Sequence, residues 1–359
     1  MARRNKRDLS IANFNLYNLN LPGQPIYDKN GWTDEQYAAK IAFSRRMIQE
    51  TDADIIGFQE CWDAKALAEI FDESGLRNGY DLIARTLEPR GIQVALAVRK
   101  GMLQGEPSWI EDLPHDARFV DLKEARDAQE SVTVTIRRFS RPLLRAVVSK
   151  ARGTPDIVVY VAHLKSKGPT TLRSDRDNPV LGRNRFIART VVSHVRRMVE
   201  AGALRAILDT EMDDNDTPVI VLGDLNDATT ATSTELISGN PGYRFFAKST
   251  AGSQSDTGLY TVEKLQQLRS FRHVYYTYMF QNQMESLDHI MVSDSFYDHS
   301  AIRKWSFREM RVLNDHLTLT KDEREQFGYN DHGIIVAHFD WNLMIEEVEK
   351  IIAEGQDDA

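Results

Sequence analysis

Residues 219–226 have the sequence VIVLGDLN, in which a short apolar run is followed by Gly223, Asp224 and Asn226. The run is rich in β-branched residues and has the length of a strand buried in a sheet. Asp224 and Asn226 are separated by two positions, so an extended backbone would place both side chains on one side. The sequence therefore predicts a buried strand that presents a carboxylate and an amide at its end.

Four further regions share this design, with polar residues closing an apolar strand. They are ANFN at residues 12–15, GFQE at 57–60, VAHLK at 161–165, and the pair LDH at 287–289 with NDHG at 330–333. Carboxylate, amide and imidazole groups can bind a metal ion or a phosphate. One such residue alone has an ordinary structural explanation, such as a turn for Asp224, and only the set as a whole favours a functional site.

Strand signals recur along the whole chain, and helices are predicted between some of them. Several passages between strands, such as residues 125–162, leave no room for a helix, so the sheets are expected to be mixed or partly antiparallel. Thr33 and Asp34 can cap the first helix. Strands are predicted at residues 9–14, 55–59, 94–98, 143–148, 157–162, 219–222, 288–292 and 334–339, and helices at 33–49, 182–206 and 342–354.

The composition is that of an ordinary globular protein. The chain has 359 residues, a formal charge of −8 and 42% hydrophobic residues, which excludes a mainly disordered or collagen-like chain. The single cysteine, Cys61, excludes an intrachain disulfide and a cysteine-rich metal cluster. No run approaches the ~18 apolar residues of a membrane span, and no apolar signal segment follows the basic N-terminus. We therefore expect a cytoplasmic protein.

No linker rich in proline, glycine or serine divides the chain, and no internal repeat is present. We therefore expect a single domain over residues 8–340, followed at 341–359 by a C-terminal helix and an acidic tail. Residues 165–182 and 249–258 have loop composition and are long enough to suggest functional loops.

In their order along the chain, the polar segments resemble the endonuclease/exonuclease/phosphatase superfamily, whose fold is that of pancreatic deoxyribonuclease I, and within it a bacterial nuclease-like branch. The resemblance runs from about residue 8 to residue 339, with one mild departure at Asn330, where the family usually has serine. It implies an α/β (α+β) fold, a four-layer α/β/β/α sandwich of two packed mixed β-sheets flanked by helices. It also implies phosphoester hydrolysis with a divalent cation, usually Mg²⁺, with Mn²⁺ or Ca²⁺ as other candidates.

The resemblance assigns a metal region to three residues. Glu60 is a carboxylate at a strand end, the hard oxygen ligand that Mg²⁺ prefers, and Asn15 matches the asparagine beside it. Asp331 would support the same region. Asp224 and Asn226 match residues that orient the attacking water and hold the phosphate.

Two histidines complete the expected catalytic set. His332 matches a general base or phosphate binder, and Asp288 matches the carboxylate that orients it, as in hydrolytic triads. His163 matches a histidine that assists the leaving oxygen. The sequence leaves open whether Asp224 or His332 accepts the proton of the water. His289 is expected to point to the opposite face of its strand from Asp288 and to be structural.

Three residues are predicted to contact the substrate. Arg141 lies in FSRP, which resembles a family segment whose arginine touches a substrate phosphate. Lys165 follows His163 at a spacing of two and can reach a phosphate. Tyr278 can stack on a base, although packing is its ordinary role. Residues 163–205 also carry an excess of lysine and arginine, which fits either a solvated helix face or a groove for a polyanion.

The leading functional hypothesis is a Mg²⁺-dependent phosphodiesterase, a nuclease that cleaves DNA or RNA. A phosphatase or phospholipase of the same fold, acting on a phosphoinositide, sphingomyelin or a nucleotide, is the enzyme alternative. An inactive scaffold is the alternative from another class, and it is disfavoured because every expected position holds a chemically competent residue. The choice between DNA and RNA, strand preference, internal or terminal cleavage, oligomeric state and protein partners are left open.

Overall fold

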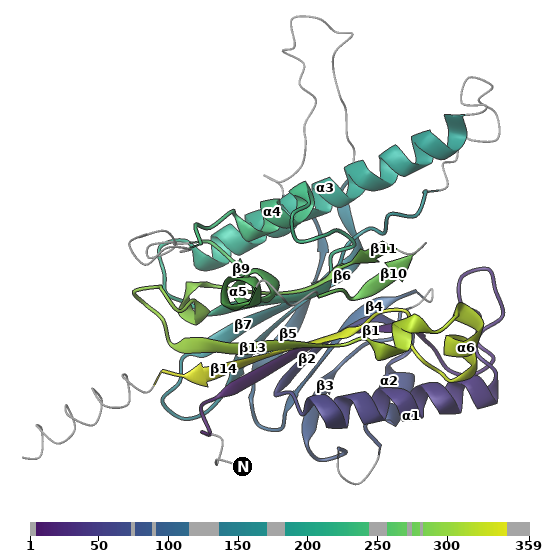
Figure 1. Ribbon diagram of the computed structural model, residues 1–359, viewed down its shortest axis with the longest axis horizontal. Helices are drawn as coiled ribbons and strands as arrows, with labels where there is room; N and C mark the ends of the chain where they lie inside the picture. Colours follow the sequence, from purple (N-terminus) through teal and green to yellow (C-terminus); the bar gives the residue numbers. More distant parts are fainter. Residues whose placement is uncertain are drawn as a thin grey trace, which may run out of the picture.

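The computed structural model describes residues 5–72, 76–87, 91–114, 136–170, 184–243, 257–270, 275–280 and 283–342. Its centre is formed by two six-stranded sheets packed face to face, with helices on the two outer faces (Figure 1). This is the four-layer arrangement that the family resemblance implies. The predicted C-terminal helix at 342–354 and the acidic tail lie almost entirely outside the described residues.

The first sheet has the strand order β13-β14-β1-β2-β4-β3. Only the β1 and β2 pair in it is parallel, and the other neighbours run antiparallel. Its strands are β1 (Leu9–Leu19), β2 (Ile55–Cys61), β3 (Tyr80–Ile83), β4 (Gln93–Arg99), β13 (Trp305–Leu313) and β14 (Ile334–Trp341).

The second sheet has the order β5-β6-β7-β8-β12-β9. It too contains one parallel pair, β7 with β8, among antiparallel neighbours. Both sheets are therefore mixed, as predicted. The strands are β5 (Leu103–Asp112), β6 (Arg138–Ser149), β7 (Asp156–His163), β8 (Val219–Asp224), β9 (Tyr260–Thr261) and β12 (Asp288–Val292).

Helices cover both outer faces, and a small hairpin lies outside the two sheets. In Figure 1, α1 and α2 lie against the first sheet, α3 and α4 against the second, and the hairpin β10–β11 beside one end of the sandwich. Their bounds are α1 (Asp34–Thr51), α2 (Ala64–Ile70), α3 (Arg185–Met212), α4 (Thr232–Ser238), α5 (Val262–Arg269), α6 (Lys321–Gln326), β10 (Tyr278–Phe280) and β11 (Gln283–Glu285), with 3-10 turns at Asp294–Phe296 and Asp315–Thr318.

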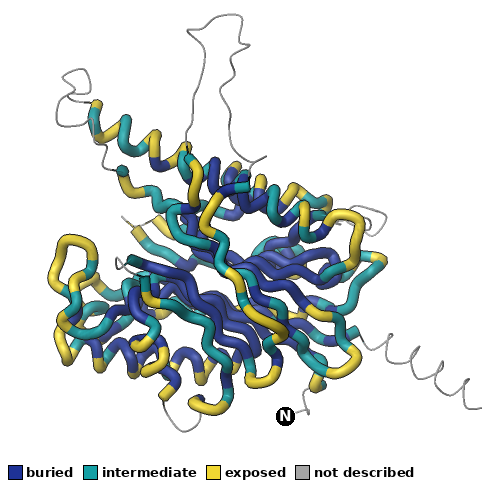
Figure 2. The backbone as a smooth tube through the Cα atoms, turned by 180° about the vertical axis from the view of Figure 1, so that it is seen from behind, coloured by how far each residue is buried: buried dark blue, intermediate teal, exposed yellow. Residues whose placement is uncertain are grey.

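Three hydrophobic clusters fill the spaces between the layers. Ile11 and Ile220 belong to the cluster between the two sheets. Phe58 and Ile48 belong to the cluster between the first sheet and its helices, and Leu204 to the cluster under α3. The strands are accordingly the most deeply buried part of the chain (Figure 2). Burial on both faces explains why these strands are continuous apolar runs.

The first helix begins where the sequence predicts. The Thr33 hydroxyl accepts a hydrogen bond from the Gln36 N–H, and the Gln36 side chain accepts one from the Thr33 N–H, which is a capping box. The helix ends at Asp52 in a left-handed conformation with φ 42°. The second predicted helix, at 182–206, continues further than expected, to Met212. None of the described helices is both long and apolar enough to cross a membrane.

Candidate active site

Strand register brings the main predicted residues together at one rim of the second sheet. His163 closes β7 and lies opposite Asp224, which closes the parallel strand β8. Asp288 opens the antiparallel strand β12 and lies opposite Asp224 from the other side. Three chemically active side chains therefore stand side by side on adjacent strands, although they are far apart in the sequence.

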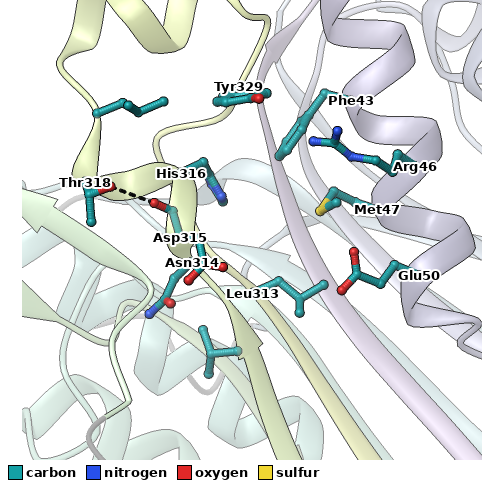
Figure 3. Close-up of a pocket in the computed structure, with 12 residues that line it drawn as sticks. Phe43, Arg46, Met47, Glu50, Leu313, Asn314, Asp315, His316, Thr318 and Tyr329 are labelled. Atoms are coloured by element: carbon teal, nitrogen blue, oxygen red, sulfur yellow. Dashed lines mark hydrogen bonds between the residues drawn. The ribbon is translucent and has the colours of Figure 1, made fainter.

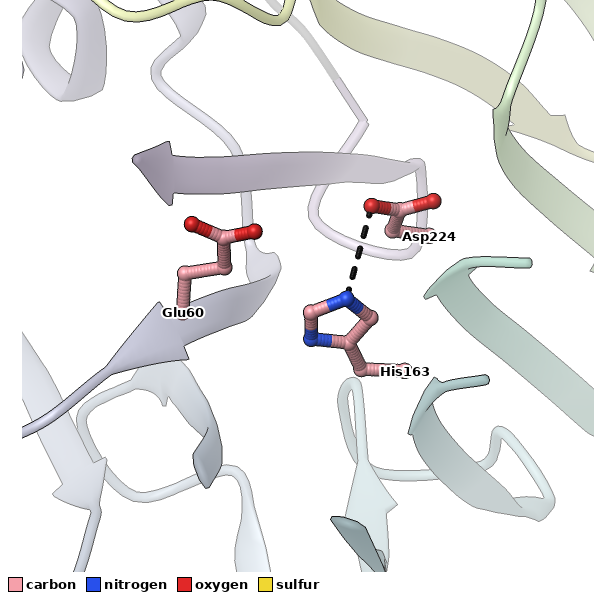
Figure 4. A group of neighbouring side chains, drawn as sticks. All are labelled: Glu60, His163 and Asp224. Carbon is pink, nitrogen blue, oxygen red and sulfur yellow. Dashed lines mark ion pairs between the residues drawn. The ribbon is translucent and has the colours of Figure 1, made fainter. Parts of the chain in front are cut away.

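Asp224 lies at the centre of this group. His332 Nδ1 is 2.7 Å from Asp288 Oδ2, while its Nε2 is 3.9 Å from Asp224 Oδ2. His163 Nε2 is 3.6 Å from the same Asp224 oxygen (Figure 4). All four side chains are at most 8% exposed. Asp288 therefore orients His332 so that its second ring nitrogen faces Asp224.

Buried amides behind the site fix the position of Asp288. The Asn13 side-chain amide donates a hydrogen bond to Asp288 Oδ1 at 3.4 Å, and Gln59 Nε2 donates to Asn13 Oδ1 at 2.8 Å. Both residues belong to the segments that the sequence singles out, yet the sequence predicts no role for them. The signal available is a polar residue within an otherwise apolar run.

The first sheet contributes the candidate metal region. Glu60 lies at a register irregularity of β2 and has φ 59°, and its Oε2 accepts the Asn18 backbone N–H at 3.0 Å. Asn15 Nδ2 donates to Asp224 Oδ2 at 3.1 Å, and Asn15 Oδ1 accepts the Tyr17 N–H at 2.9 Å. Asn15 thus links the ends of the two sheets.

Asp331 is held next to this region by its neighbour Asn330. The Asn330 side chain donates to the Asn15 carbonyl oxygen at 2.7 Å and accepts a hydrogen bond from Lys40 Nζ at 2.9 Å. Lys40 is fully buried on α1, with its ammonium over the rings of Tyr17 and Trp32. The position where the family usually has serine is therefore the contact of a buried lysine.

Lys40 is a residue that the sequence alone does not single out. Its only signal is its place on the buried face of α1, three positions after Tyr37 and four before Ser44, where an apolar residue is the rule.

The electrostatics of the site show an excess of negative charge. Burial raises the pKa of Asp224 to about 7, with further contributions from Asp288 and Glu60. Burial also raises the pKa of Glu60, reinforced by Asp331, and the pKa of Asp331. Carboxylates shifted in this direction hold their charge poorly until a cation approaches.

The two histidines respond in opposite directions. Burial acts to lower the pKa of His332, but the charges of Asp288 and Asp224 outweigh it and raise that pKa well above its usual value. Burial and the positive charges of Arg141 and His332 lower the pKa of His163. The two shifts favour the protonated form of His332 and the neutral form of His163.

The donor set fits a divalent cation. One ligand atom from each of Glu60, His163 and Asp224 lies within 4.8 Å of the others, and the same holds for Asp224, Asp288 and His332. Asp331 Oδ1 is buried and has no hydrogen-bond partner among the described residues. Hard oxygen donors with unsatisfied lone pairs match Mg²⁺ or Ca²⁺ chemistry. His163, predicted to assist the leaving oxygen, stands as near to Glu60 as a ligand would.

Asn226 departs from its expected geometry. The sequence predicts an extended backbone that carries it beside Asp224, but β8 ends at Asp224 and Asn226 has φ 56°. Its N–H donates to Asp224 Oδ1 at 2.9 Å, and its side-chain amide donates to the Leu164 carbonyl at 3.2 Å. The extended-strand prediction is wrong here because the chain turns at once, and asparagine tolerates that left-handed turn. His289 binds the Asp227 carbonyl through Nε2 at 2.8 Å.

The predicted substrate residues differ in where they point. Arg141 Nη1 donates to the Leu164 carbonyl at 3.0 Å, and its charge lowers the pKa of Glu60. Tyr278 has its ring 5.0 Å from the ring of His332 and stacks on Phe280. Lys165 Nζ instead donates to Ser166 and Gly168 in its own loop. Arg141 and Tyr278 thus lie at the site, while Lys165 is engaged locally.

Most arginines of the basic stretch that can be placed are already engaged. Arg196 pairs with Glu200 and Arg197 with Asp227, while Arg205 contacts Asp209. Arg197 is 1% exposed. Arg173, Arg176 and Arg183 lie outside the described residues. The described part of the stretch is therefore more structural than its charge suggests.

A groove of about 410 Å³ lies between α1 and residues 313–319, behind His332. Phe43 and Met47 line one wall and His316 the other (Figure 3). Its link to the site is the 2.9 Å hydrogen-bond contact between His316 Nε2 and the His332 carbonyl oxygen. His316, on the groove wall, therefore holds the backbone of His332, and the acidic cluster does not line this groove.

Comparison with known proteins agrees with this arrangement. The Endonuclease/Exonuclease/phosphatase family matches residues 17–310. No curated protein sequence matches the chain. An endonuclease/exonuclease/phosphatase family protein from Bacteroides thetaiotaomicron is similar in structure, with a TM-score of 0.53 at 15% identity, covering 94% of this chain and 96% of that one.

Two further solved structures have the same fold. Truncated Caenorhabditis elegans TDP2 gives a TM-score of 0.52 at 13% identity, covering 93% of this chain and 98% of that one. The human Nocturnin catalytic domain with bound sulfate gives 0.50 at 15% identity, covering 93% and 95%. With the family match extending over most of its length, and the predicted residues meeting at one rim of a four-layer sandwich, the chain belongs to the endonuclease/exonuclease/phosphatase family.

Proposed function

We propose that the protein is a divalent-metal-dependent phosphodiesterase, a nuclease that hydrolyses DNA or RNA phosphodiester bonds by in-line attack of water. The observation that carries the proposal is the placement of Asp224 between two histidines, with His332 oriented by Asp288 at 2.7 Å. Phosphoryl transfer needs a positioned water and charge stabilisation on the phosphoryl oxygens more than covalent chemistry. This rim has groups for both.

Glu60, Asn15 and Asp331 would hold the cation, and His163 and Asp224 lie beside them at the same rim. When bound, Mg²⁺ would supply charge neutralisation for the phosphoryl oxygens. The hydrogen bond from Asn15 to Asp224 joins the ends of the two sheets at this point. The orphaned Asp331 oxygen supports this assignment.

The two candidate bases differ in charge state. Because His332 is held protonated by Asp288 and Asp224, we assign it to hold a phosphoryl oxygen by donating from Nε2. Asp224, with its pKa raised to about 7, is then the group that accepts the proton of the attacking water, since a base works best when its pKa lies near the working pH. Neutral His163 is suited to donate a hydrogen bond to the substrate.

Arg141 and Tyr278 flank this centre. Arg141, whose charge already acts on Glu60 and His163, would grip the scissile phosphate. Tyr278, next to the ring of His332, would contact the adjacent base or sugar. Lys165, turned into its own loop, would serve only after rearrangement.

One observation favours a second candidate, a phospholipase of the same fold. Phe186, Ile187 and Val191 are 67%, 60% and 53% exposed on the first turns of α3. Large exposed apolar side chains close together are typical of contact with another apolar surface. A lipid phosphodiester would then replace the nucleic acid as substrate.

The test is hydrolysis by the purified protein with Mg²⁺ or Mn²⁺, assayed against plasmid, linear DNA, RNA, phosphomonoesters and sphingomyelin vesicles. We expect cleavage of a nucleic acid that chelation with EDTA abolishes and that Asp224→Asn lacks. Cleavage of sphingomyelin alone would select the phospholipase. No metal-dependent hydrolysis of any ester would support the scaffold alternative.

A further inference from the structure

A second cavity, of about 430 Å³, opens beside the candidate metal region. It lies between α6 and residues 17–32, which comprise the end of β1 and the segment after it. Its walls are aromatic at Tyr17, Tyr27 and Trp32, and its polar lining includes Asn30, Lys29 and the ion pair of Lys321 with Glu325. None of these residues takes part in the proposed hydrolysis.

The cavity shares a wall with the site. Asn18 lines it and donates its backbone N–H to Glu60 Oε2 at 3.0 Å. The Asn18 carbonyl accepts the Trp32 indole N–H at 2.9 Å, and its side-chain oxygen accepts that of Trp62 at 3.0 Å. One residue thus ties the cavity walls to a candidate metal ligand.

Tyr27 stands at the junction of cavity and site. Its side chain is 59% exposed and its ring packs edge-on against Trp62 at 5.1 Å. Burial and the charge of Glu60 raise the pKa of its hydroxyl, and Arg141 lowers it, so the side chain is within electrostatic range of both residues. A group bound in the cavity could therefore belong to the same molecule as a phosphate that lies between Arg141 and Glu60.

The backbone around the cavity is held in an unusual shape. Tyr17, Asn18 and Tyr27 have φ of 46°, 55° and 54°, a region that residues with a side chain rarely adopt. Such residues cluster at ligand sites when surrounding contacts hold them in place. Here Gly23 N–H bonds to the Trp32 carbonyl at 2.9 Å, and Asn20 Nδ2 to the Pro25 carbonyl at 3.0 Å.

We propose that this cavity binds the nucleobase of the nucleotide adjoining the scissile phosphate. Its volume is in the range of small-ligand pockets, aromatic walls stack on bases, and Asn30 can bond to a base edge. Lys29 can meet the next phosphate, whereas Lys321 is paired with Glu325 at 3.6 Å in the same cavity. The inference rests on the proposed phosphodiesterase function, and it makes an unpaired nucleotide the unit that the site recognises.

The first test measures binding without turnover. Chains carrying Asp224→Asn, with and without Tyr27→Leu, are titrated with AMP and with inorganic phosphate in Mg²⁺, followed by tryptophan fluorescence. We expect AMP to bind more tightly than phosphate, and Tyr27→Leu to weaken AMP by about fivefold to a hundredfold without changing phosphate. Equal affinities for AMP and phosphate in the Asp224→Asn chain would overturn the proposal.

A matched control removes an equally exposed ring elsewhere. Phe186 is 67% exposed on α3, so Phe186→Leu should leave AMP binding unchanged. If Phe186→Leu weakens AMP as much as Tyr27→Leu does, the effect is not specific to the cavity and the proposal fails. Both positions are exposed, so neither variant should unfold the chain, and circular dichroism melting verifies this.

The second test uses catalysis to separate the pocket from the reaction. The parent and the Tyr27→Leu variant are compared on three substrates. These are an intact dinucleotide, the analogue without its first base and the analogue without its second base. Tyr27→Leu should lower kcat/KM roughly tenfold or more for the intact dinucleotide and leave one abasic analogue unaffected. Equal losses on intact and abasic substrates would contradict base binding. Failure of the parent to cleave any of these substrates would contradict the proposed function. The AMP titration would still test base binding in the cavity, because it needs no turnover.

Discussion

The two sides of the candidate site differ in how their charges are balanced. On the side of the second sheet, Asp288 is paired with His332 at 2.7 Å, and Asp224 accepts a hydrogen bond from Asn15 at 3.1 Å. On the side of the first sheet, Glu60 receives one backbone N–H, and Asp331 Oδ1 has no partner among the described residues. On the second side the Asp288–His332 pair is complete, whereas the first side is arranged to be completed by a cation.

The comparison shows where metal dependence and catalytic orientation reside. A paired carboxylate has its desolvation compensated in the folded protein, while an unpaired one keeps that cost until it finds a partner. Substitutions on the two sides should therefore impair hydrolysis in different ways. On the second-sheet side they should lower the rate, and on the first-sheet side they should change the metal requirement.

The largest effect is expected on the second-sheet side. His332→Ala should lower the rate by about 10²–10³, the usual cost of removing one hydrogen-bond donor that stabilises charge in the transition state. Because Asp288 acts through His332, Asp288→Asn combined with His332→Ala should lose little beyond the worse single variant. Steady-state kinetics of the two single variants and the double variant at saturating Mg²⁺ measure this. Losses that add in log rate would show two independent roles.

A smaller but distinct effect is expected at Glu60. Burial raises the pKa of the Glu60 carboxyl, which means that its charged form is disfavoured in the folded protein. Glu60→Gln removes that charge, so the metal-free variant should melt at a higher temperature than the metal-free parent. The same change should weaken Mg²⁺ binding roughly tenfold, which removes about 1.4 kcal/mol of stabilisation by Mg²⁺. Melting curves with EDTA and across an Mg²⁺ series give both quantities. A parent-like Mg²⁺ series would exclude Glu60 as a ligand.

Lys40 provides a test of the charge behind the first-sheet side. Burial lowers its pKa to about 7 from an unfolded value of about 10.5. Between these values the unfolded chain binds more protons, so stability rises with pH, by up to about 1.4 kcal/mol per pH unit. Below pH 7 both states are protonated and this dependence disappears.

The measurement is urea unfolding of the parent and Lys40→Met between pH 6 and 10. The stability of the parent relative to the variant should increase above pH 7 and stay level below it. A difference that is independent of pH over this whole range would show that Lys40 keeps its proton in the folded state.

The smallest effect is expected on α3, outside the comparison of the two sides. If Arg185 and Arg189 meet a nucleic acid, replacing both by Gln should flatten the dependence of log affinity on log salt by at most about 2, because each contact with duplex DNA contributes roughly −0.9. Arg141→Ala should instead slow the hydrolysis of nucleic acids and of small phosphodiesters alike. Binding measured from low to moderate salt shows the slope, and an unchanged slope would leave the two arginines as a solvated face.

The sequence by itself determined the interior of the fold. The eight strands predicted from apolar runs correspond to β1, β2, β4, β6, β7, β8, β12 and β14, which are the interior strands of the two sheets. Within the two large sheets, the strands that the sequence does not predict, β3, β5, β9 and β13, are the edges. Interior strands are buried on both faces and must be apolar, whereas an edge strand such as β5 is largely exposed and carries no such pattern.

The ordered polar segments likewise predict that Glu60, His163, Asp224, Asp288 and His332 lie at the ends of apolar strands, from the sequence pattern alone. Only the tertiary structure decided what surrounds them. Lys40 and Asn330 are separated by 290 positions, and the cavity beside the site is lined both by residues 17–36 and by Lys321 and Glu325 of α6. A local pattern records which face of a strand or helix is buried, but it does not record which distant side chain will fill the space beside it. That partner depends on the packing of whole layers, and so the buried lysine and the aromatic cavity are visible only in the folded chain.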